Sequence, residues 1–561
     1  MRASVVVAAL ALALAGAGRA DDAAVLRAFQ AVDGQTLPEA EAHVRLHALV
    51  AALDEAGLPR SATVALATLA ADEKQSEAVR SAAREELIVR AARDGSLAQS
   101  LLARMDGAGK LPPQLALRLA RSHLERALQL SPLEEGVAFT GVARGPAVAN
   151  ASVEEVPLDP ELAKEMGEPR SGEPAAKPAS EDREPVTGTR AKFEIDRARA
   201  LAASIPAGDP AAVDGHEISG LAALALGEAD GAEKEFLAVV QAPRTRGDGE
   251  RRDRAFLQLA RLTYQRGDDA RATQLYEKVG RGAPEWLDAL FEATWAHFRT
   301  GDDEHALGNL LTLHAPFFQG RFFPESFVLK ALVLYENCRY GEARASLVEF
   351  AQRYQPLHDG LAATLVKLPT PQTAYDFLAG GAVRIEAVPA AAREELARLA
   401  QDADLTAGLR AVQELAQEID SFDRRQPQLR ASSFAGRVLP LARQARLSLL
   451  ETTGRRLQAR IDSERAELRE LLGQSLRLSY EIAGREKELA AAPGNGLSAS
   501  AHPDKPQVDE DEVIWPFEGE YWRDELGSYR FQLGQRCKKP RAAPMQAREP
   551  DRQEPRAAAG Q

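Results

Sequence analysis

The feature that most constrains this chain is an internal repeat of 34 residues. Residues 255–286, "AFLQLARLTYQRGDDARATQLYEKVGRGAPEW", align with residues 289–318, "ALFEATWAHFRTGDDEHALGNLLTLHAPFF". The string Gly-Asp-Asp begins at Gly267 and again at Gly301, 34 residues later. Apolar residues on both sides recur at three- and four-residue spacing, which predicts amphipathic helices. The pattern therefore predicts stacked helical hairpins, because one hairpin cannot bury its apolar face alone.

The residue types within the repeat suit such hairpins. Ala260 and Ala272 are small where two helices must approach closely, and Gly267 permits the tight turn between them. We expect Tyr276 to fill the space toward the next repeat and Pro284 to stop the second helix. The positions that carry the repeat pattern are Ala260, Gly267, Ala272, Tyr276, Pro284, Gly301, Ala306 and Ala343.

Two looser copies flank this pair. The upstream copy offers Gly220, Gly227, Ala232 and Phe236. The downstream copy offers Ala331, Tyr335, Tyr340, Ala343 and Pro356, and it places Cys338 near the position of the turn glycine. Residues 191–363 therefore resemble the tetratricopeptide repeat (TPR) family in repeat length and residue types. The resemblance implies an all-α solenoid that binds a peptide or helix of a partner protein in its groove.

The chain before the repeats divides into three parts. Residues 1–20, "MRASVVVAALALALAGAGRA", have the pattern of a secretory signal peptide with cleavage before Asp21. Residues 21–142 contain several amphipathic segments separated by short Gly and Pro breaks, which predicts degenerate TPR-like hairpins. Residues 143–190 are rich in proline and acids and poor in large apolar residues, so we expect a disordered linker.

Residues 385–492 predict two long helices with a coiled-coil pattern. The first, over 391–422, carries one apolar face, and a break near Pro427 precedes the second. The second has a heptad stripe of Leu450, Leu457, Ile461, Leu468, Leu471, Leu478, Ile482 and Leu489. An antiparallel hairpin and a homodimeric coil would use the same stripe, and we favour the hairpin.

After a linker at 493–508, residues 509–537 differ from the rest of the chain, and 538–561 have the composition of a disordered tail. The segment 509–537 is aromatic, with Trp515, Phe517, Tyr521, Trp522, Tyr529 and Phe531, and its "SYRFQL" alternates enough for a short strand. About thirty residues cannot form a core alone, so they need a surface. That surface could belong to a partner or to the chain's own solenoid, and we favour the solenoid.

The chain has two cysteines, Cys338 and Cys537. In an exported protein they are one candidate disulfide pair. The alternative is two unrelated thiols. If they are bonded, the aromatic segment is linked to the last clear repeat.

The sequence shows no constellation typical of an enzyme. It contains no phosphate-binding Gly-rich loop, no G-x-S-x-G elbow and no C-x-x-C pair. His43 and His47 lie one helical turn apart, but we interpret them as surface residues. Packing or solvent exposure explains His297, His305 and His314. We therefore expect a protein that is not an enzyme and has no cofactor and no metal.

The net charge of −13 argues against nucleic acid as a partner. The segments "FFPESFVLKALVLYENCRYGEA" (322–343) and "WPFEGEYWRDELGSYRF" (515–531), together with the signal peptide and coil, resemble large TPR proteins of the deltaproteobacterial cell envelope. These include periplasmic components of the gliding-motility (Glt/Agl) machinery of myxobacteria.

This resemblance implies a periplasmic scaffold for envelope proteins, which could form a homo-oligomer through its coil. The alternative is an assembly factor for the cell wall or outer membrane. The apolar run of the signal peptide is too short to span a bilayer and no cysteine stands at the cleavage site, so we expect no direct membrane anchor.

Overall fold

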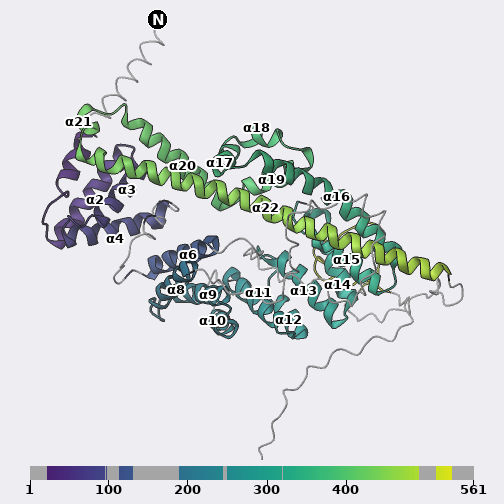
Figure 1. Cartoon of the computed structure of the whole chain (residues 1–561). Helices are drawn as coiled ribbons and strands as arrows, with labels where there is room; N and C mark the ends of the chain where they lie inside the picture. The colour runs from purple at the N-terminus through teal and green to yellow at the C-terminus, as the bar shows by residue number, and fades with distance from the viewer. Residues whose placement is uncertain are drawn as a thin grey trace, which may run out of the picture. The chain divides into compact units, whose positions relative to one another are not determined.

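The computed structural model describes residues 22–94, 97, 101, 111, 113–130, 189–243, 249–318, 320–491 and 513–533. Helices make up the regular structure, and these ranges contain no β-strand (Figure 1). The all-α prediction is therefore confirmed. The expected signal peptide, the linker at 493–508, the tail at 538–561 and nearly all of the linker at 143–190 lie outside the described residues.

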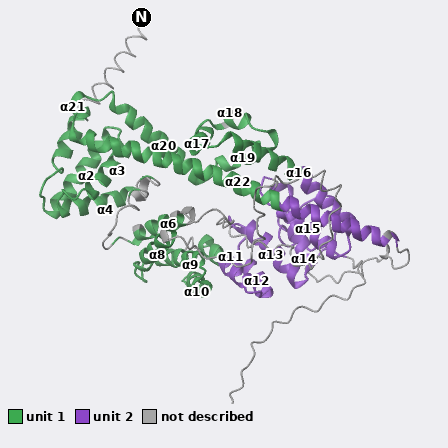
Figure 2. Cartoon of the chain, in the orientation of Figure 1, with its two compact units in different colours: residues 1–141, 152–255, 353–470 green, residues 142–151, 256–352, 471–561 purple. Residues whose placement is uncertain are grey.

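The chain forms two compact units, each assembled from separate stretches of sequence (Figure 2). Unit 1 comprises residues 1–141, 152–255 and 353–470, and unit 2 comprises residues 142–151, 256–352 and 471–561. Three helices contribute residues to both units: α11 (Gly249–Gln265), α16 (Tyr340–Lys367) and α22 (Ser433–Ala491).

The first described helix of unit 1 spans residues 22–30, and the unit is built from packed helical pairs. Helices α2, α3 and α4 pack together, α6 packs on α8, and α9 packs on α10. Its other helices are α2 (Glu39–Glu55), α3 (Pro59–Ala71), α4 (Glu77–Asp94), α6 (Pro113–Leu130), α8 (Thr189–Ala203), α9 (Ala212–Ala225), α10 (Ala229–Gln241), α17 (Pro371–Ala379), α18 (Gly381–Glu386), α19 (Arg393–Ala400), α20 (Ala403–Phe422) and α21 (Pro427–Arg430).

The core of unit 1 joins residues that are far apart in sequence. Phe29 packs edge-on against Phe434, with ring centroids 5.2 Å apart, and Phe422 stacks on the same ring at 6.2 Å. All three side chains are almost fully buried. The N-terminal hairpins and the bend between α20 and α22 therefore share one core, since a buried aromatic side chain stabilises only the elements that enclose it.

Helices α20 and α22 run antiparallel within the chain. Asp402 pairs with Arg460 at 3.2 Å, and Asp404 pairs with Arg456 at 3.1 Å. The residue numbers of the paired arginines on α22 therefore fall as those of the aspartates rise, which is the pattern of antiparallel helices. Seven side chains of the predicted heptad stripe are buried: Leu450, Leu457, Ile461 and Leu468 in unit 1, and Leu471, Leu478 and Ile482 in unit 2. The last member, Leu489, is only partly buried.

The expected continuous helix over 391–422 is wrong, because the helical residues divide into α19 and α20. The side chain of Asp402 accepts hydrogen bonds from the backbone N–H groups of Asp404 (2.9 Å) and Leu405 (3.2 Å). An aspartate in this position caps a new helix and competes with continuation of the preceding one. The break near Pro427 is confirmed, since α20 ends at Phe422 and the long helix begins at Ser433.

The prediction that Pro284 stops the second helix of its repeat is wrong, and Pro356 lies within a helix. Helix α12 (Asp269–Tyr276) ends well before Pro284, which lies in the loop that leads to the next helix. Pro356 lies inside α16, which continues to Lys367. A proline within a helix removes one hydrogen bond and costs about 3 kcal/mol in isolation. Burial of the neighbouring Leu357 and Leu361 offsets that cost here.

Unit 2 contains three consecutive helix–turn–helix pairs. They are formed by α11 and α12, by α13 (Trp286–Thr300) and α14 (Asp303–Leu313), and by α15 (Glu325–Glu336) and the first part of α16. A short 3₁₀ helix, η3 (Pro316–Phe318), follows α14. The small residues predicted at the helix contacts have no exposed surface: Ala260, Ala272, Ala306 and Ala343.

The turn of each pair contains, at the equivalent position, one residue whose backbone is in the left-handed conformation. Gly267 has φ of 81°, Gly301 has φ of 77° and Cys338 has φ of 56°. In unit 1, Gly227 between α9 and α10 has φ of 75°. Glycine adopts this conformation without the steric cost that a side chain adds. The predicted turn positions are therefore confirmed, and Cys338 occupies a position that favours glycine.

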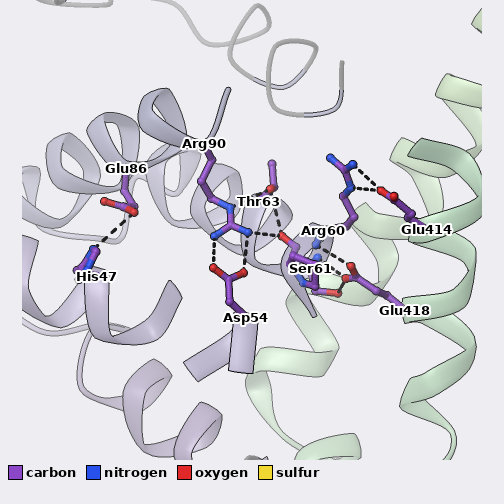
Figure 3. A network of polar contacts seen from close by, with 10 residues as sticks. His47, Asp54, Arg60, Ser61, Thr63, Glu86, Arg90, Glu414 and Glu418 are labelled. Carbon is purple, nitrogen blue, oxygen red and sulfur yellow. Dashed lines mark hydrogen bonds and ion pairs between the residues drawn. The ribbon is translucent and has the colours of Figure 1, made fainter. Parts of the chain in front are cut away.

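A buried carboxylate attaches α20 to the start of α3 in unit 1 (Figure 3). Glu418 accepts hydrogen bonds from the backbone N–H of Arg60 at 2.7 Å, and from the N–H and hydroxyl of Ser61 at 2.6 and 2.8 Å. The Arg60 guanidinium pairs with Glu414 one turn earlier at 2.8 Å. Helix α3 has no side-chain cap of its own, so Glu418 satisfies N–H groups that would otherwise lack acceptors.

We predict that Glu418→Ala destabilises unit 1 by about 2–4 kcal/mol, because it leaves the buried N–H of Ser61 and the partly buried N–H of Arg60 without their acceptor. Gln417→Ala, an exposed change on the same helix, is the control. Urea denaturation measures the loss of stability, and amide hydrogen exchange in α3 locates it. Equal stability of the two variants would show that α3 does not depend on this cap.

A second carboxylate in unit 1 is held in its neutral form. Arg398 lies between Glu395 and Glu464 and pairs with both. Burial, together with the nearby Glu395 carboxylate, raises the pKa of Glu464 to about 9. One guanidinium neutralises only one of the two acids, so the second retains its proton.

This raised pKa predicts a stability that falls with rising pH. The ordinary pKa of this carboxyl is 4.5, and in the folded state it is about 9. At any pH between these two values, the folded state holds a proton on Glu464 that the unfolded state has lost. Glu464→Gln removes this contribution, so the variant should gain stability relative to the parent as pH rises from 5 to 9. Melting temperatures across this range, with exposed Glu451→Gln as control, measure the effect. Parallel pH profiles for the parent and Glu464→Gln would contradict it.

Candidate interaction surface

The C-terminal aromatic segment lies on helices α13 and α14 of unit 2. The backbone N–H of Gly527 donates to the hydroxyl of Thr312 at 2.9 Å, and the N–H of Phe531 donates to the carbonyl of Glu304 at 2.9 Å. Both acceptors belong to α14. Residues 513–533, called the docked segment below, therefore contact the chain's own helices.

Two glycines allow the close approach. A Cβ atom at Gly308 would lie only 1.7 Å from the carbonyl oxygen of Tyr529. Gly527 has φ of 87°, and a Cβ atom there would lie 2.8 Å from the Trp286 ring. The backbone of the docked segment thus lies directly on α14, in space that a side chain would fill.

Apolar anchors on the docked segment face inward. Leu526 and Tyr529 are 6% and 4% exposed, and they cluster with Ala315. Trp286 and Phe318 pack against this cluster. The Tyr529 hydroxyl donates to the carbonyl of Trp522 and accepts from its N–H, both at 2.9 Å. The segment is therefore folded on itself as well as anchored.

Cationic contacts supplement the anchors. The Arg281 guanidinium donates to the carbonyl of Asp524 and the hydroxyl of Ser528. Arg530 pairs with Glu304 at 3.2 Å. These pairs are exposed, so each contributes only about 0–1 kcal/mol. Arg339 lies 5.6 Å above the Phe531 ring.

Several large apolar side chains of the docked segment and one of η3 are exposed. Ile514 is 55% exposed, Phe517 44% and Trp522 41%, and Phe317 of η3 is 51% exposed. The Arg523 guanidinium lies 5.6 Å above the Phe317 ring. We call Phe317, Ile514, Phe517 and Trp522 the aromatic face.

The two tryptophans link the inward and outward sides of the segment. Trp515 stacks on Trp522, with centroids 4.9 Å apart, and its ring lies 5.4 Å from Tyr529. Phe517 packs edge-on against Tyr521. Of the six aromatics predicted to dock, Tyr529 is buried, Trp515, Tyr521 and Phe531 are partly buried, and Phe517 and Trp522 are exposed. The expected strand over "SYRFQL" is wrong: this extended stretch makes a single backbone bond to α14 and has no ladder partner in the described chain.

Cys338 is disulfide-bonded, in the turn between α15 and α16. The chain has two cysteines, and the other, Cys537, lies outside the described residues. One cysteine of the disulfide thus lies in the turn of the third helix pair of unit 2.

His43 and His47 lie at the surface, as expected, and His314 packs against a neighbouring ring. The His43 and His47 rings face Glu85 at 3.5 Å and Glu86 at 3.8 Å, in separate contacts. His314 stacks on Phe327 and contacts the Ser326 hydroxyl at 2.9 Å.

His297 and His305 meet at one carboxylate, which sequence reasoning missed. Their Nδ1 atoms lie 3.2 Å and 2.6 Å from Oδ2 of Asp302. The available signal was the position of both histidines close to the Gly-Asp-Asp turn, on opposite sides of it.

No protein-family model matches this chain, and no curated protein matches its sequence. Among the described residues, no helix is both long enough and apolar enough to cross a membrane.

We predict that Gly308→Ala displaces the docked segment, although alanine favours helix by about 1 kcal/mol. Limited proteolysis should cut the variant between residues 513 and 533 faster than the parent, and tryptophan fluorescence should shift toward that of solvated indole. Gly341→Ala in α16 is the matched control, because a Cβ atom there meets no atom within 4 Å. Unchanged cleavage in Gly308→Ala would contradict this account of the docking.

Proposed function

We propose that this protein is a non-enzymatic scaffold of the TPR type, exported to the periplasm, which binds other cell-envelope proteins. The observation that carries the proposal is the docked segment, which is anchored by Leu526 and Tyr529 and presents an aromatic face outward. A segment whose only role was to cover α14 would not need large apolar side chains on its outer side.

The repeated helix pairs support the scaffold part of the proposal. Left-handed turn residues at Gly267, Gly301 and Cys338, with buried alanines at the helix contacts, are the arrangement that the TPR resemblance implies. Helical repeat proteins bind partners through extended surfaces and need no reacting groups. The signal-peptide pattern supports export.

The surroundings of the aromatic face indicate the chemistry of its partner. Glu518, Glu520, Asp524 and Glu525 of the docked segment are all exposed near it. An apolar centre with a charged rim is typical of protein interfaces, and aromatic residues dominate their binding energy. The partner segment should therefore insert apolar side chains and carry Lys or Arg around them.

The choice of envelope process rests on the sequence resemblance. Similarity of residues 322–343 and 515–531 to myxobacterial gliding-motility proteins favours a place in that complex. The alternative is an assembly factor for the cell wall or outer membrane. Both would use the aromatic face.

In-cell photo-crosslinking tests the proposal. A photoreactive phenylalanine analogue at Phe517 should crosslink to a specific envelope protein, whereas the same analogue at Tyr480, 67% exposed on α22, should not. Replacing Phe317 and Trp522 by alanine should lower the yield at position 517 about tenfold, which corresponds to about 1.4 kcal/mol of binding free energy.

The identity of the crosslinked protein distinguishes the two processes, together with loss of gliding or loss of envelope integrity after deletion. Equal crosslinking at both positions would contradict the role of the aromatic face. A mature protein that retains residues 1–20 and stays in the cytoplasm would contradict export.

A further inference from the structure

The turn between α13 and α14 gathers three potential metal ligands. His297 is in the last turn of α13, Asp302 precedes α14 and His305 is in the first turn of α14. One ligand atom from each lies within 4.8 Å of the other two. We propose that His297, Asp302 and His305 form a binding site for a first-row divalent metal ion, with Zn²⁺ the best match to two imidazoles and one carboxylate.

The geometry is close to that of a bound ion. Adjacent ligands of a tetrahedral zinc ion are about 3.3 Å apart, given metal–ligand distances near 2.0–2.1 Å. Here the Nδ1 atom of His297 is 3.2 Å from Oδ2 of Asp302, and that of His305 is 2.6 Å away. The two rings are nearly parallel, with centroids 5.2 Å apart, and both Nδ1 atoms face Oδ2 of Asp302. Small rotations of the side chains would admit the ion.

The neighbouring repeat shows that the hairpin does not require these histidines. Asp268 caps α12 as Asp302 caps α14, each accepting a hydrogen bond from the backbone N–H three residues later. Thirty-four residues before His297 and His305, however, stand Thr263 and Arg271. Capping therefore explains the aspartate but not the two imidazoles around it.

The electrostatic environment suits a cation. An aspartate carboxylate is ordinarily charged at neutral pH. The Nδ1 atoms of both imidazoles face the Oδ2 atom of Asp302. Its Oδ1 atom faces the backbone N–H of His305 at 3.4 Å, which leaves Oδ2 for the imidazoles or for an ion that replaces their protons.

The exposure of the three groups allows an ion to enter and to keep further ligands. The side chains of Asp302 and His305 are 36% and 39% exposed, whereas that of His297 is 11% exposed. Three protein ligands with an open side leave a position for water or a fourth ligand. Such an ion would crosslink α13 to α14, next to Glu304, which holds the docked segment. The inference does not depend on the proposed function.

Calorimetric titration of Zn²⁺ into the full-length, untagged protein tests the site. We expect saturable binding of one ion per chain and a higher melting temperature for the metal-bound protein. The variant His297→Thr with His305→Arg installs the residues that the neighbouring repeat tolerates, and it should weaken binding at least about tenfold while leaving the metal-free melting temperature close to that of the parent. His216→Ala is the control, because His216 pairs with Glu235 in a separate contact.

X-ray absorption of the zinc-bound protein identifies the ligands independently. Two imidazoles with oxygen ligands and no sulfur are expected, and single-variant His305→Ala should lose one imidazole. Absence of saturable binding to the parent would overturn the proposal. So would equal affinity of the parent and the double variant, because the ion would then lie elsewhere on the chain.

Discussion

Helix α22 has 59 residues, and its apolar stripe must be buried against other helices along most of its length. Much of this fold follows from that requirement. An isolated helix gains little from its own hydrogen bonds, so α22 depends on burial of that stripe. In unit 1 the partners are α20, running antiparallel, and the N-terminal helices that meet at Phe434. In unit 2, Leu478 and Ile482 join the core of the helix pairs. The stripe therefore organises the interior of each unit.

Local features of the fold could be predicted because local chemistry decides them. A left-handed residue is needed wherever two antiparallel helices are joined by a minimal turn, and glycine supplies it at Gly267 and Gly301. Cys338 adopts the same conformation, so the repeat alignment located the turn even where the residue type was unusual. The burial of Ala260 and Ala272 followed from the same alignment.

Features that depend on tertiary contacts could not be predicted. The break at Asp402 is a competition between a cap and continuation of an amphipathic helix, and periodicity alone favours continuation. Pro356 is tolerated because burial around it outweighs one lost hydrogen bond. The sequence suggested that the aromatic segment would dock, but its place was set by the absence of a side chain at Gly308, more than 200 residues earlier. The meeting of His297 and His305 likewise depends on the angle of one turn.

The interleaving of the two units affects how the chain can be made. Each unit draws on stretches from the first and second halves of the sequence, so neither corresponds to a contiguous fragment. During synthesis, the helix pairs of unit 2 are complete long before the segment that covers α14 exists. Contacts of such long sequence separation form slowly, and the uncovered surface is prone to aggregation meanwhile. A fragment that ends before residue 353 therefore lacks part of both units.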